Sequence, residues 1–250
     1  MELNKIYNED CIETLKRIPD GCIDLLLQDV PYGLTQNDWD KMPNLSIIWE
    51  EWLRITKQNG AMVFTAQQPF TSDLIESKRE LFRYDLIWYK QGKATGFLNA
   101  NRMPLRIHEE IIVFYRKLPT YNPQKLKGKE NHSKGSHSRG KKQTNNNYGD
   151  FDQSFESPPT DDKFPLSVVE FASVHPPIHP TQKPVDLMRW LIKTYTNEEE
   201  TVFDGYMGSG TTAVACIKEK RNWIGSEISK EYCELAEKRI AVYLNQTTLF

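Results

Sequence analysis

Hydrophobic positions follow two different periods along the first half of the chain. Short, nearly unbroken apolar runs predict buried strands, and apolar residues three or four apart predict helices. The expected strands span 5–7, 23–29, 61–65, 84–89 and 110–115. Helices are expected from Ile12 to Pro19, from a cap at Asn44 to a stop at Asn59-Gly60, and around Leu74. This alternation predicts an α/β fold with a mainly parallel sheet covered on both faces.

The pattern breaks after Tyr115. Residues 117–142 hold eight Lys and Arg against the single acid Glu130, and an acidic run follows from Asp150 to Asp162. One interpretation is a solvated, partly disordered insertion. The other is a mobile basic loop that grips phosphates, and both can hold because such segments often order on binding.

Regular periodicity returns near residue 166. A stiff, proline-rich connector over 175–184 leads into a helix through Leu187, Leu191 and Ile192. A strand over 201–204, a glycine-rich turn over 205–210, a helix over 211–220, a strand over 223–227 and a helix over 232–244 complete the pattern. We therefore divide the chain into 1–116, 117–165 and 166–245, with a tail at 246–250.

Composition fits one sizeable α/β domain with a small insertion. The 250 residues are 38% hydrophobic and 26% charged, and the net charge of -2 excludes no partner, since a basic patch can sit within a balanced total. No apolar stretch has membrane-spanning length and the first residues do not form a signal peptide, so we expect a soluble cytoplasmic protein. Four cysteines without CxxC spacing predict reduced thiols, and their spacing to histidines gives a zinc site almost no support, so no metal is expected.

Two strand ends carry candidate chemistry. Asp29-Val30-Pro31-Tyr32-Gly33 follows the strand over 23–29, at the sheet edge where open α/β folds bind ligands. An acid beside an aromatic there suits a planar ligand with a hydrogen-bond donor on its rim.

The second strand end is followed by Gly208-Ser209-Gly210, which lets a ligand approach backbone at a helix N-terminus. Glu227 lies 17 residues beyond Gly210 at the end of the next strand, near the spacing of an acid that binds ribose hydroxyls. Ala213 breaks the dinucleotide fingerprint and the P-loop lysine is missing, so an adenosine ligand without a pyrophosphate fits best. The alternative is that Asp204 only caps the turn and Glu227 is a surface acid.

The order D-x-P-Y, then HPTQKP, then D-x-x-x-G-S-G-T-T resembles the β-class DNA amino-methyltransferases, particularly phage-type adenine-N6 enzymes that use S-adenosylmethionine. The resemblance covers nearly the whole chain. It implies a Rossmann-like methyltransferase fold with a mostly parallel seven-stranded sheet and a circularly permuted motif order. The catalytic half precedes the cofactor half, and a DNA-recognition insertion lies between them.

The resemblance also assigns roles to matching residues. In the family, the acid and the next carbonyl accept hydrogen bonds from the target amine and the aromatic stacks on the flipped base, which implies Asp29, Val30, Pro31 and Tyr32 as catalytic. The implied cofactor-binding residues are Asp10, His179, Thr181, Gln182, Lys183, Asp204, Tyr206, Gly208, Ser209, Gly210, Thr211, Thr212 and Glu227. Two positions depart from the pattern: Val30 replaces a proline, and Gly205-Tyr206 replaces Pro-Phe.

The implied reaction is direct in-line methyl transfer to the N6 amine of a flipped adenine. Cytosine-N4 enzymes share the geometry but tend to have Ser in place of Asp29, so the acid favours adenine. No Pro-Cys dipeptide occurs, which argues against cytosine-C5 methylation. The competing interpretation is a DNA-binding module of the same fold that has lost turnover.

Double-stranded DNA is the expected partner. The candidate DNA-binding residues are polar or basic and flank the catalytic motifs: Lys93, Asn99, Arg102, Arg106, Lys125, Lys127, Lys129, Arg139, Lys141 and Lys142. Gln246, Leu249 and Phe250 look like a peptide that docks on bacterial sliding clamps, although a tail that packs on its own domain or frays is the alternative. A homodimer is possible by family resemblance.

Overall fold

The computed structural model describes residues 1–33, 42–128, 143–145, 149–151 and 161–247. The chain forms two compact units, one of residues 1–122 with 167–250 and the other of residues 123–166. The larger unit contains the central sheet and every helix of the described residues. No helix in this part of the chain is both long and apolar enough to cross a membrane. All four cysteines are free thiols.

The central sheet has eight strands among the described residues. Their order across the sheet is β1 (Lys5–Tyr7), β12 (Asn222–Ser226), β11 (Thr201–Asp204), β2 (Ile23–Gln28), β3 (Thr56–Ala66), β5 (His108–Phe114), β4 (Phe82–Tyr89) and β10 (Val168–Glu170). All neighbours are parallel except β5, which is antiparallel to both β3 and β4. The α/β, mostly parallel architecture is therefore confirmed. The sheet has one strand more than the expected seven, because β10 adds a short parallel edge to β4.

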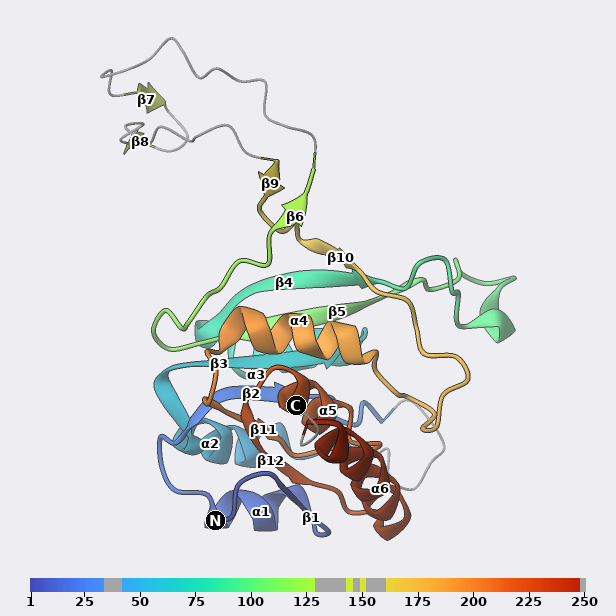
Figure 1. Ribbon diagram of the computed structural model, residues 1–250. Coiled ribbons are helices and arrows are strands. Elements are labelled where there is room, and N and C mark those ends of the chain that lie inside the picture. Colours follow the sequence, from blue (N-terminus) through green and yellow to red (C-terminus); the bar gives the residue numbers. More distant parts are fainter. Residues whose placement is uncertain (34–41, 129–142, 146–148, 152–160, 248–250) are drawn as a thin grey trace. The chain divides into compact units, whose positions relative to one another are not determined.

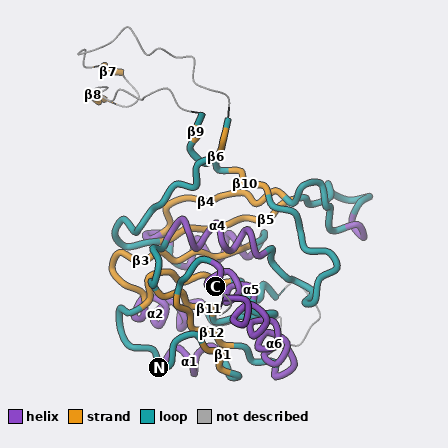
Figure 2. Tube along the Cα trace, viewed as in Figure 1, coloured by secondary structure: helices purple, strands orange, loops and turns teal. Residues whose placement is uncertain are grey.

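Helices cover both faces of this sheet (Figures 1 and 2). One face carries α4 (Val185–Tyr195), α5 (Thr211–Lys218) and α6 (Lys230–Thr247), and the other carries α1 (Cys11–Arg17), α2 (Leu45–Ile55) and α3 (Phe70–Ser77). In β3, Ala61 and Val63 join the first core cluster while Met62 and Phe64 join the second. Since successive side chains of a strand point to opposite faces, burial on both sides explains the unbroken apolar runs of the sequence.

The end of α2 differs from the prediction. The helix stops at Ile55 rather than at Asn59-Gly60, and β3 begins at Thr56, which pairs with Ile23 of β2. A Cβ on Gly60 would lie 2.7 Å from Thr56 Cγ2 and 2.9 Å from the Asp24 carbonyl oxygen. Gly60 is therefore required by close packing inside a bulged strand pair, not by a helix terminus.

Other boundaries shift by a few residues. α1 begins at Cys11 because Asp10 caps it, accepting a 2.8 Å hydrogen bond from the Ile12 amide. α3 begins at Phe70 rather than at Thr71 or Ser72, α5 ends at Lys218 rather than Lys220, and α6 extends from Lys230 to Thr247. Such terminal shifts leave the packing faces unchanged.

The smaller unit contains two short antiparallel strand pairs. β6 (Leu126–Lys127) pairs with β9 (Asp162–Lys163), and β7 (Gln143–Asn145) pairs with β8 (Gly149–Phe151). Apolar periodicity did not predict these pairs, since each strand is only two or three residues long.

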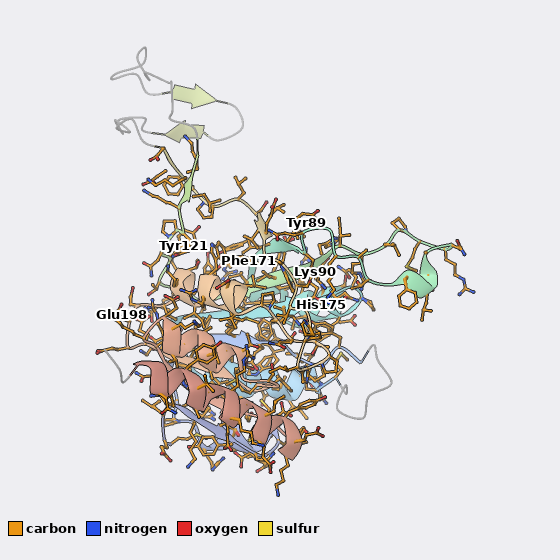
Figure 3. All side chains as sticks on the ribbon, turned by 45° about the vertical axis from the view of Figure 1, so that its right-hand side comes forward. Tyr89, Lys90, Tyr121, Phe171, His175 and Glu198 are labelled. Carbon is orange, nitrogen blue, oxygen red and sulfur yellow. The ribbon has the colours of Figure 1, made fainter. Side chains whose placement is uncertain are left out.

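One edge of the central sheet gathers several strand ends. The parallel strands β2, β11, β3 and β4 finish there, and β5 starts there because it runs in the opposite direction. The register places Glu109 opposite Trp88 and Glu110 opposite Ala66. At the end of β4, just before Lys90, the Tyr89 carbonyl accepts a 3.3 Å hydrogen bond from the Phe171 amide (Figure 3).

Candidate active site

A cavity of about 1280 Å³ opens at this edge of the sheet. Every residue that the sequence predicted to be catalytic or cofactor-binding lines it, except Gly210. These residues come from five separate parts of the sequence, at 10, 29–32, 179–183, 204–212 and 227, which the strand order brings to one place.

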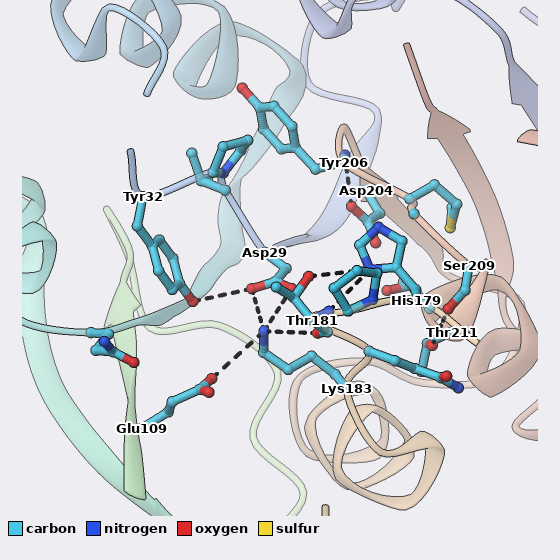
Figure 4. A pocket seen from close by; sticks show the side chains of 18 of the residues that line it. Asp29, Tyr32, Glu109, His179, Thr181, Lys183, Asp204, Tyr206, Ser209 and Thr211 are labelled. Carbon is cyan, nitrogen blue, oxygen red and sulfur yellow. Dashed lines mark hydrogen bonds and ion pairs between the residues drawn. The ribbon is translucent and has the colours of Figure 1, made fainter. Parts of the chain in front are cut away.

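Asp29 follows β2 and its side chain is 20% exposed. Its Oδ1 accepts hydrogen bonds from the Thr65 hydroxyl at 2.6 Å, the Tyr32 hydroxyl at 3.1 Å and Lys183 Nζ at 2.7 Å. Within the part of the chain that the structure describes, its Oδ2 accepts from Lys183 Nζ alone, at 2.7 Å (Figure 4). The two oxygens are thus unequal: Oδ1 has three donors, and Oδ2 keeps a lone pair for a further donor in the cavity.

Lys183 belongs to a buried group of alternating charges. Its side chain is 5% exposed, and its Nζ lies 3.6 Å from Glu109 Oε2 (Figure 4), while Lys90 forms an ion pair with Glu109. Burial disfavours the Lys183 ammonium, but Asp29 and Glu109 outweigh this and raise its pKa. Burial likewise disfavours the Glu109 carboxylate, yet Lys183 and Lys90 hold its pKa below the usual value. Two acids and two lysines therefore compensate one another in a site where an isolated charge would be costly.

This arrangement gives Lys183 a position that the sequence did not predict. The resemblance grouped it with the cofactor-binding residues, whereas its Nζ contacts both carboxylate oxygens of Asp29. Thr65 and Glu109 were missed altogether. Thr65 lies inside an apolar strand. Glu109 is the second residue of β5, so only the antiparallel direction of this strand could have indicated that Glu109 reaches the ligand edge.

Tyr32 is fixed on two sides. Its ring stacks on Phe70 with 5.2 Å between centroids and 25° between planes, and its hydroxyl donates to Asp29. Burial, with the nearby charges of Asp29 and Glu109, raises the pKa of Tyr32 well above its ordinary value, so the phenol stays protonated as a donor. The neighbouring Val30 side chain is 2% exposed and packs into the core on the α1–α3 face.

Asp204 ends β11 and is 4% exposed. Burial raises its pKa to about 7, and the charges of Asp29 and Glu227 act in the same direction, while hydrogen bonds from Thr212 and the Tyr206 amide oppose them. Among the residues that the structure describes, no basic side chain forms an ion pair with Asp204. This carboxyl group would therefore gain from a positively charged ligand.

The turn after β11 is shaped by glycines with left-handed backbone. Gly208 has φ 50° and Gly210 has φ 77°, and a Cβ on Gly210 would lie 3.0 Å from Ala236 Cβ. Glu227, 9% exposed, accepts 2.8 Å hydrogen bonds from the Gly208 and Ser229 amides, and burial raises its pKa. Arg239, which the sequence did not indicate, donates from α6 to the Ser209 carbonyl at 3.0 Å.

The HPTQKP segment, residues 179–184, forms another wall of the cavity. The His179 ring packs edge-on against Tyr232 at 4.3 Å, and burial lowers its pKa, so the neutral imidazole is favoured. The Thr181 amide donates to His179 Nδ1 at 3.3 Å, and Gln182 Oε1 accepts from the Ile178 amide at 2.9 Å. These local contacts fix the segment beside the glycine turn.

The predicted DNA-binding residues of the described part of the chain are divided between the two units. Lys93, Asn99 and Arg106 line the cavity from the loop between β4 and β5, and Arg102 is an exposed residue of the same loop. In the smaller unit, Lys125 lies over the Phe164 ring and Lys127 forms ion pairs with Asp161 and Asp162. Because these two carboxylates already compensate its charge, Lys127 is a poorer candidate for binding a phosphate. Lys129, Arg139, Lys141 and Lys142 lie outside the described residues.

The cavity thus contains a polar end at Asp29 and an acidic end at Asp204 and Glu227. The first can accept a hydrogen bond at Asp29 Oδ2. The second offers buried acids, a glycine turn at a helix N-terminus and the face of His179. Among the described residues, no group of three His, Cys, Asp or Glu side chains could hold a metal ion.

Several curated proteins are similar in sequence to this chain over nearly its whole length. The type II methyltransferase M.HpaI of Haemophilus parainfluenzae is 26% identical over 94% of this chain and 74% of its own length. The DNA adenine methyltransferase YhdJ of Escherichia coli is 26% identical over 96% of this chain and 84% of its own length. The crystal structure of the M1.HpyAVI–SAM complex matches the fold with a TM-score of 0.63 at 24% identity, covering 94% of this chain and 98% of that one.

Residues 23–238 match the family model described as DNA methylase (N6_N4_Mtase). The match includes both strand ends of the cavity and the connector between them. The chain belongs to this DNA methylase family.

Proposed function

We propose that this protein transfers a methyl group from S-adenosylmethionine to the N6 amine of an adenine that has been flipped out of double-stranded DNA. The observation that carries the proposal is the acceptor geometry of Asp29. Asp29 lines the cavity, and its Oδ2 has one donor among the described residues, while Thr65, Tyr32 and Lys183 hold Oδ1 in place.

The chemistry requires such an acceptor. An exocyclic adenine amine is a weak nucleophile because its lone pair is delocalised into the ring. Hydrogen bonds to Asp29 Oδ2 and to the Val30 carbonyl would orient the amine and favour the tetrahedral geometry that frees the lone pair. The base would stack on the face of Tyr32 opposite Phe70, which offsets part of the cost of leaving the duplex.

The acidic end fits the cofactor. S-adenosylmethionine supplies an electrophilic methyl group on a sulfonium and also carries a positively charged amine. Asp204 and Glu227 are buried acids with raised pKa values, so a cationic ligand would stabilise their ionised forms. The glycine turn and the α5 N-terminus would hold the adenosine part, and Glu227 the ribose hydroxyls.

Adenine is favoured over cytosine by the residue at position 29. A carboxylate accepts hydrogen bonds from an amine without competing as a donor, whereas the serine typical of cytosine-N4 enzymes can act as either. The matched relative YhdJ is named as an adenine methyltransferase. Cytosine-N4 methylation is the second candidate, since the matched family includes both chemistries.

A direct test is incubation of the purified protein with S-adenosylmethionine and unmethylated bacterial DNA, followed by digestion to nucleosides and mass spectrometry. We expect N6-methyl-2′-deoxyadenosine in the digest and none in a reaction without cofactor. N4-methyl-2′-deoxycytidine instead would reassign the target base. DNA binding without either product would support the interpretation of a binding module that has lost turnover.

Sequencing of the methylated DNA would then identify the recognised site. The homodimer remains a prediction. Docking to a sliding clamp is also untested: Gln246 lies in α6, and Leu249 and Phe250 lie outside the described residues.

A further inference from the structure

The loop between β4 and β5, residues 91–107, exposes two large apolar side chains at adjacent positions. Phe97 is 77% exposed and Leu98 is 83% exposed, and both lie on the short 3-10 helix η2 (Phe97–Asn99). Single exposed apolar residues are ordinary, but an adjacent pair on a projecting turn is typical of a contact surface.

The loop holds this pair outward through its own backbone. Thr95 and Arg106 exchange two hydrogen bonds, of 2.8 and 3.1 Å, across the base of the loop. Gly96 adopts a left-handed φ of 83° just before the turn, and the Asn99 amide donates to its carbonyl at 2.9 Å. The exposure of Phe97 and Leu98 is therefore part of the ordered loop conformation.

The charge of the loop indicates which kind of partner would contact Phe97 and Leu98. Residues 91–107 include Lys93, Arg102 and Arg106 and contain no acid. Lys93 and Arg106 also line the cavity that contains Asp29. Apolar side chains flanked by cations complement a ligand in which apolar surfaces alternate with phosphates, which is the arrangement of stacked bases in a nucleic acid duplex.

We propose that Phe97 and Leu98 insert into the base stack at the position that the target base leaves. This inference rests on the proposed function, because it requires a base to leave the duplex and enter the cavity. Unstacking the target base leaves an apolar gap between its neighbours, and an inserted side chain would refill it. Lys93 and Arg106 would bind the adjacent phosphates and so direct the extruded base toward Asp29.

The test compares the Phe97→Ala/Leu98→Ala double variant with wild type on two short duplexes that contain the recognised site. One duplex is fully paired, and the other has a mismatch opposite the target base, which lowers the cost of extrusion. We expect kcat/KM of the double variant to fall at least about ten-fold on the paired duplex and to recover most of that loss on the mismatched one. Leu118→Ala, which removes a 76% exposed leucine outside the loop, is the matched control and should behave as wild type on both duplexes.

A second readout follows extrusion itself. With 2-aminopurine at the target position, wild-type binding should raise its fluorescence as the base leaves the stack, and the double variant should show a much smaller rise at saturating protein. Equal losses of kcat/KM on the paired and mismatched duplexes would show an ordinary DNA contact and overturn the proposed insertion of Phe97 and Leu98. Unchanged activity on both would remove Phe97 and Leu98 from the interface. If the wild type transferred no methyl group to either of the two duplexes, the proposed function itself would be overturned, and with it the proposed insertion.

Discussion

The ends of β2 and β11 carry aspartates that face one cavity from adjacent strands, yet their surroundings are opposite. Asp29 has a buried lysine on both of its oxygens, whereas Asp204 has no cation among the described residues. Gln28 ties the two ends together, because its amide donates to the Phe203 carbonyl at 2.9 Å and accepts from the Gly205 amide at 3.1 Å. The protein therefore supplies the positive charge beside Asp29 itself, whereas beside Asp204 a bound ligand would have to supply it.

This difference explains how one cavity could serve two substrates. A neutral amine brings no charge to Asp29, so the protein must itself compensate the carboxylate. A sulfonium cofactor brings its own positive charge, so Asp204 needs none from the protein. The following changes would break or sharpen this contrast.

The largest effect should come from removing the internal cation. Lys183→Met leaves Asp29 without its lysine and weakens the compensation of Glu109, and breaking a buried ion pair costs about 3–5 kcal/mol. Lys57→Met is the matched control, because Lys57 pairs with Asp24 at the opposite end of β2 but is 41% exposed, and it should cost less than about 1 kcal/mol. Urea unfolding of both variants measures the difference.

A second variant separates the contribution of Glu109. The double variant Lys183→Met/Glu109→Gln should lose less stability than the sum of the single losses, because the glutamine removes one of the acids that the lysine compensated. Strictly additive losses would show that the three charges do not act as a group.

Asp29→Asn should abolish most of the methyl transfer while the cofactor still binds. An amide can turn a donor toward the target amine and carries no charge, so we expect kcat to fall about 10²–10³-fold. Calorimetric titration with S-adenosylmethionine should give nearly the wild-type affinity, since the cofactor end does not depend on this oxygen. Asp24→Asn, on the same strand but away from the cavity, should change kcat by no more than about two-fold. Full activity of Asp29→Asn would exclude the proposed acceptor role.

The contrast also marks what the sequence could and could not predict. Most strands of the central sheet, its helices and both strand-end motifs follow from apolar periodicity and short motifs, and the α/β fold is the expected one. Thr65, Glu109 and Arg239 could not be found that way, because strand register or helix packing, not a local motif, places them. Glu109 lines the cavity, whereas Thr65 and Arg239 donate to Asp29 and Ser209, which line it. Lys183 was found, but only the structure shows that its partner is Asp29, 154 residues earlier in the chain.

The departure at Gly205 has a structural reason that the sequence did not show. A Cβ at this position would lie 2.2 Å from Cys11 Sγ and 3.1 Å from Gln28 Oε1. Gly205→Ala should therefore destabilise the protein by about 1–3 kcal/mol through overpacking. Adding Cys11→Ala should recover part of that loss in urea unfolding, because it removes the nearest atom. If Cys11→Ala gave no recovery, the glycine would be required by Gln28 or by the backbone instead.

The smallest expected effect is a change in how folding stability depends on pH, which tests whether the Asp204 carboxyl group lacks a compensating cation. Its pKa is about 7 in the folded protein, above the ordinary value of 3.8, so between these pH values the folded state holds a proton that the unfolded state releases. Stability of the ligand-free protein therefore falls as pH rises through this window, by up to about 1.4 kcal/mol per pH unit from this group. Asp204→Asn removes that contribution, so the stability of the variant relative to wild type should increase from pH 5 to pH 7. Other titrating groups cancel in the difference, and a difference that stays constant with pH would contradict the buried, uncompensated carboxyl group. Saturating S-adenosylmethionine should flatten the wild-type dependence of stability on pH, because its positive charge would lower the pKa of Asp204. The cofactor would then compensate Asp204 as Lys183 compensates Asp29.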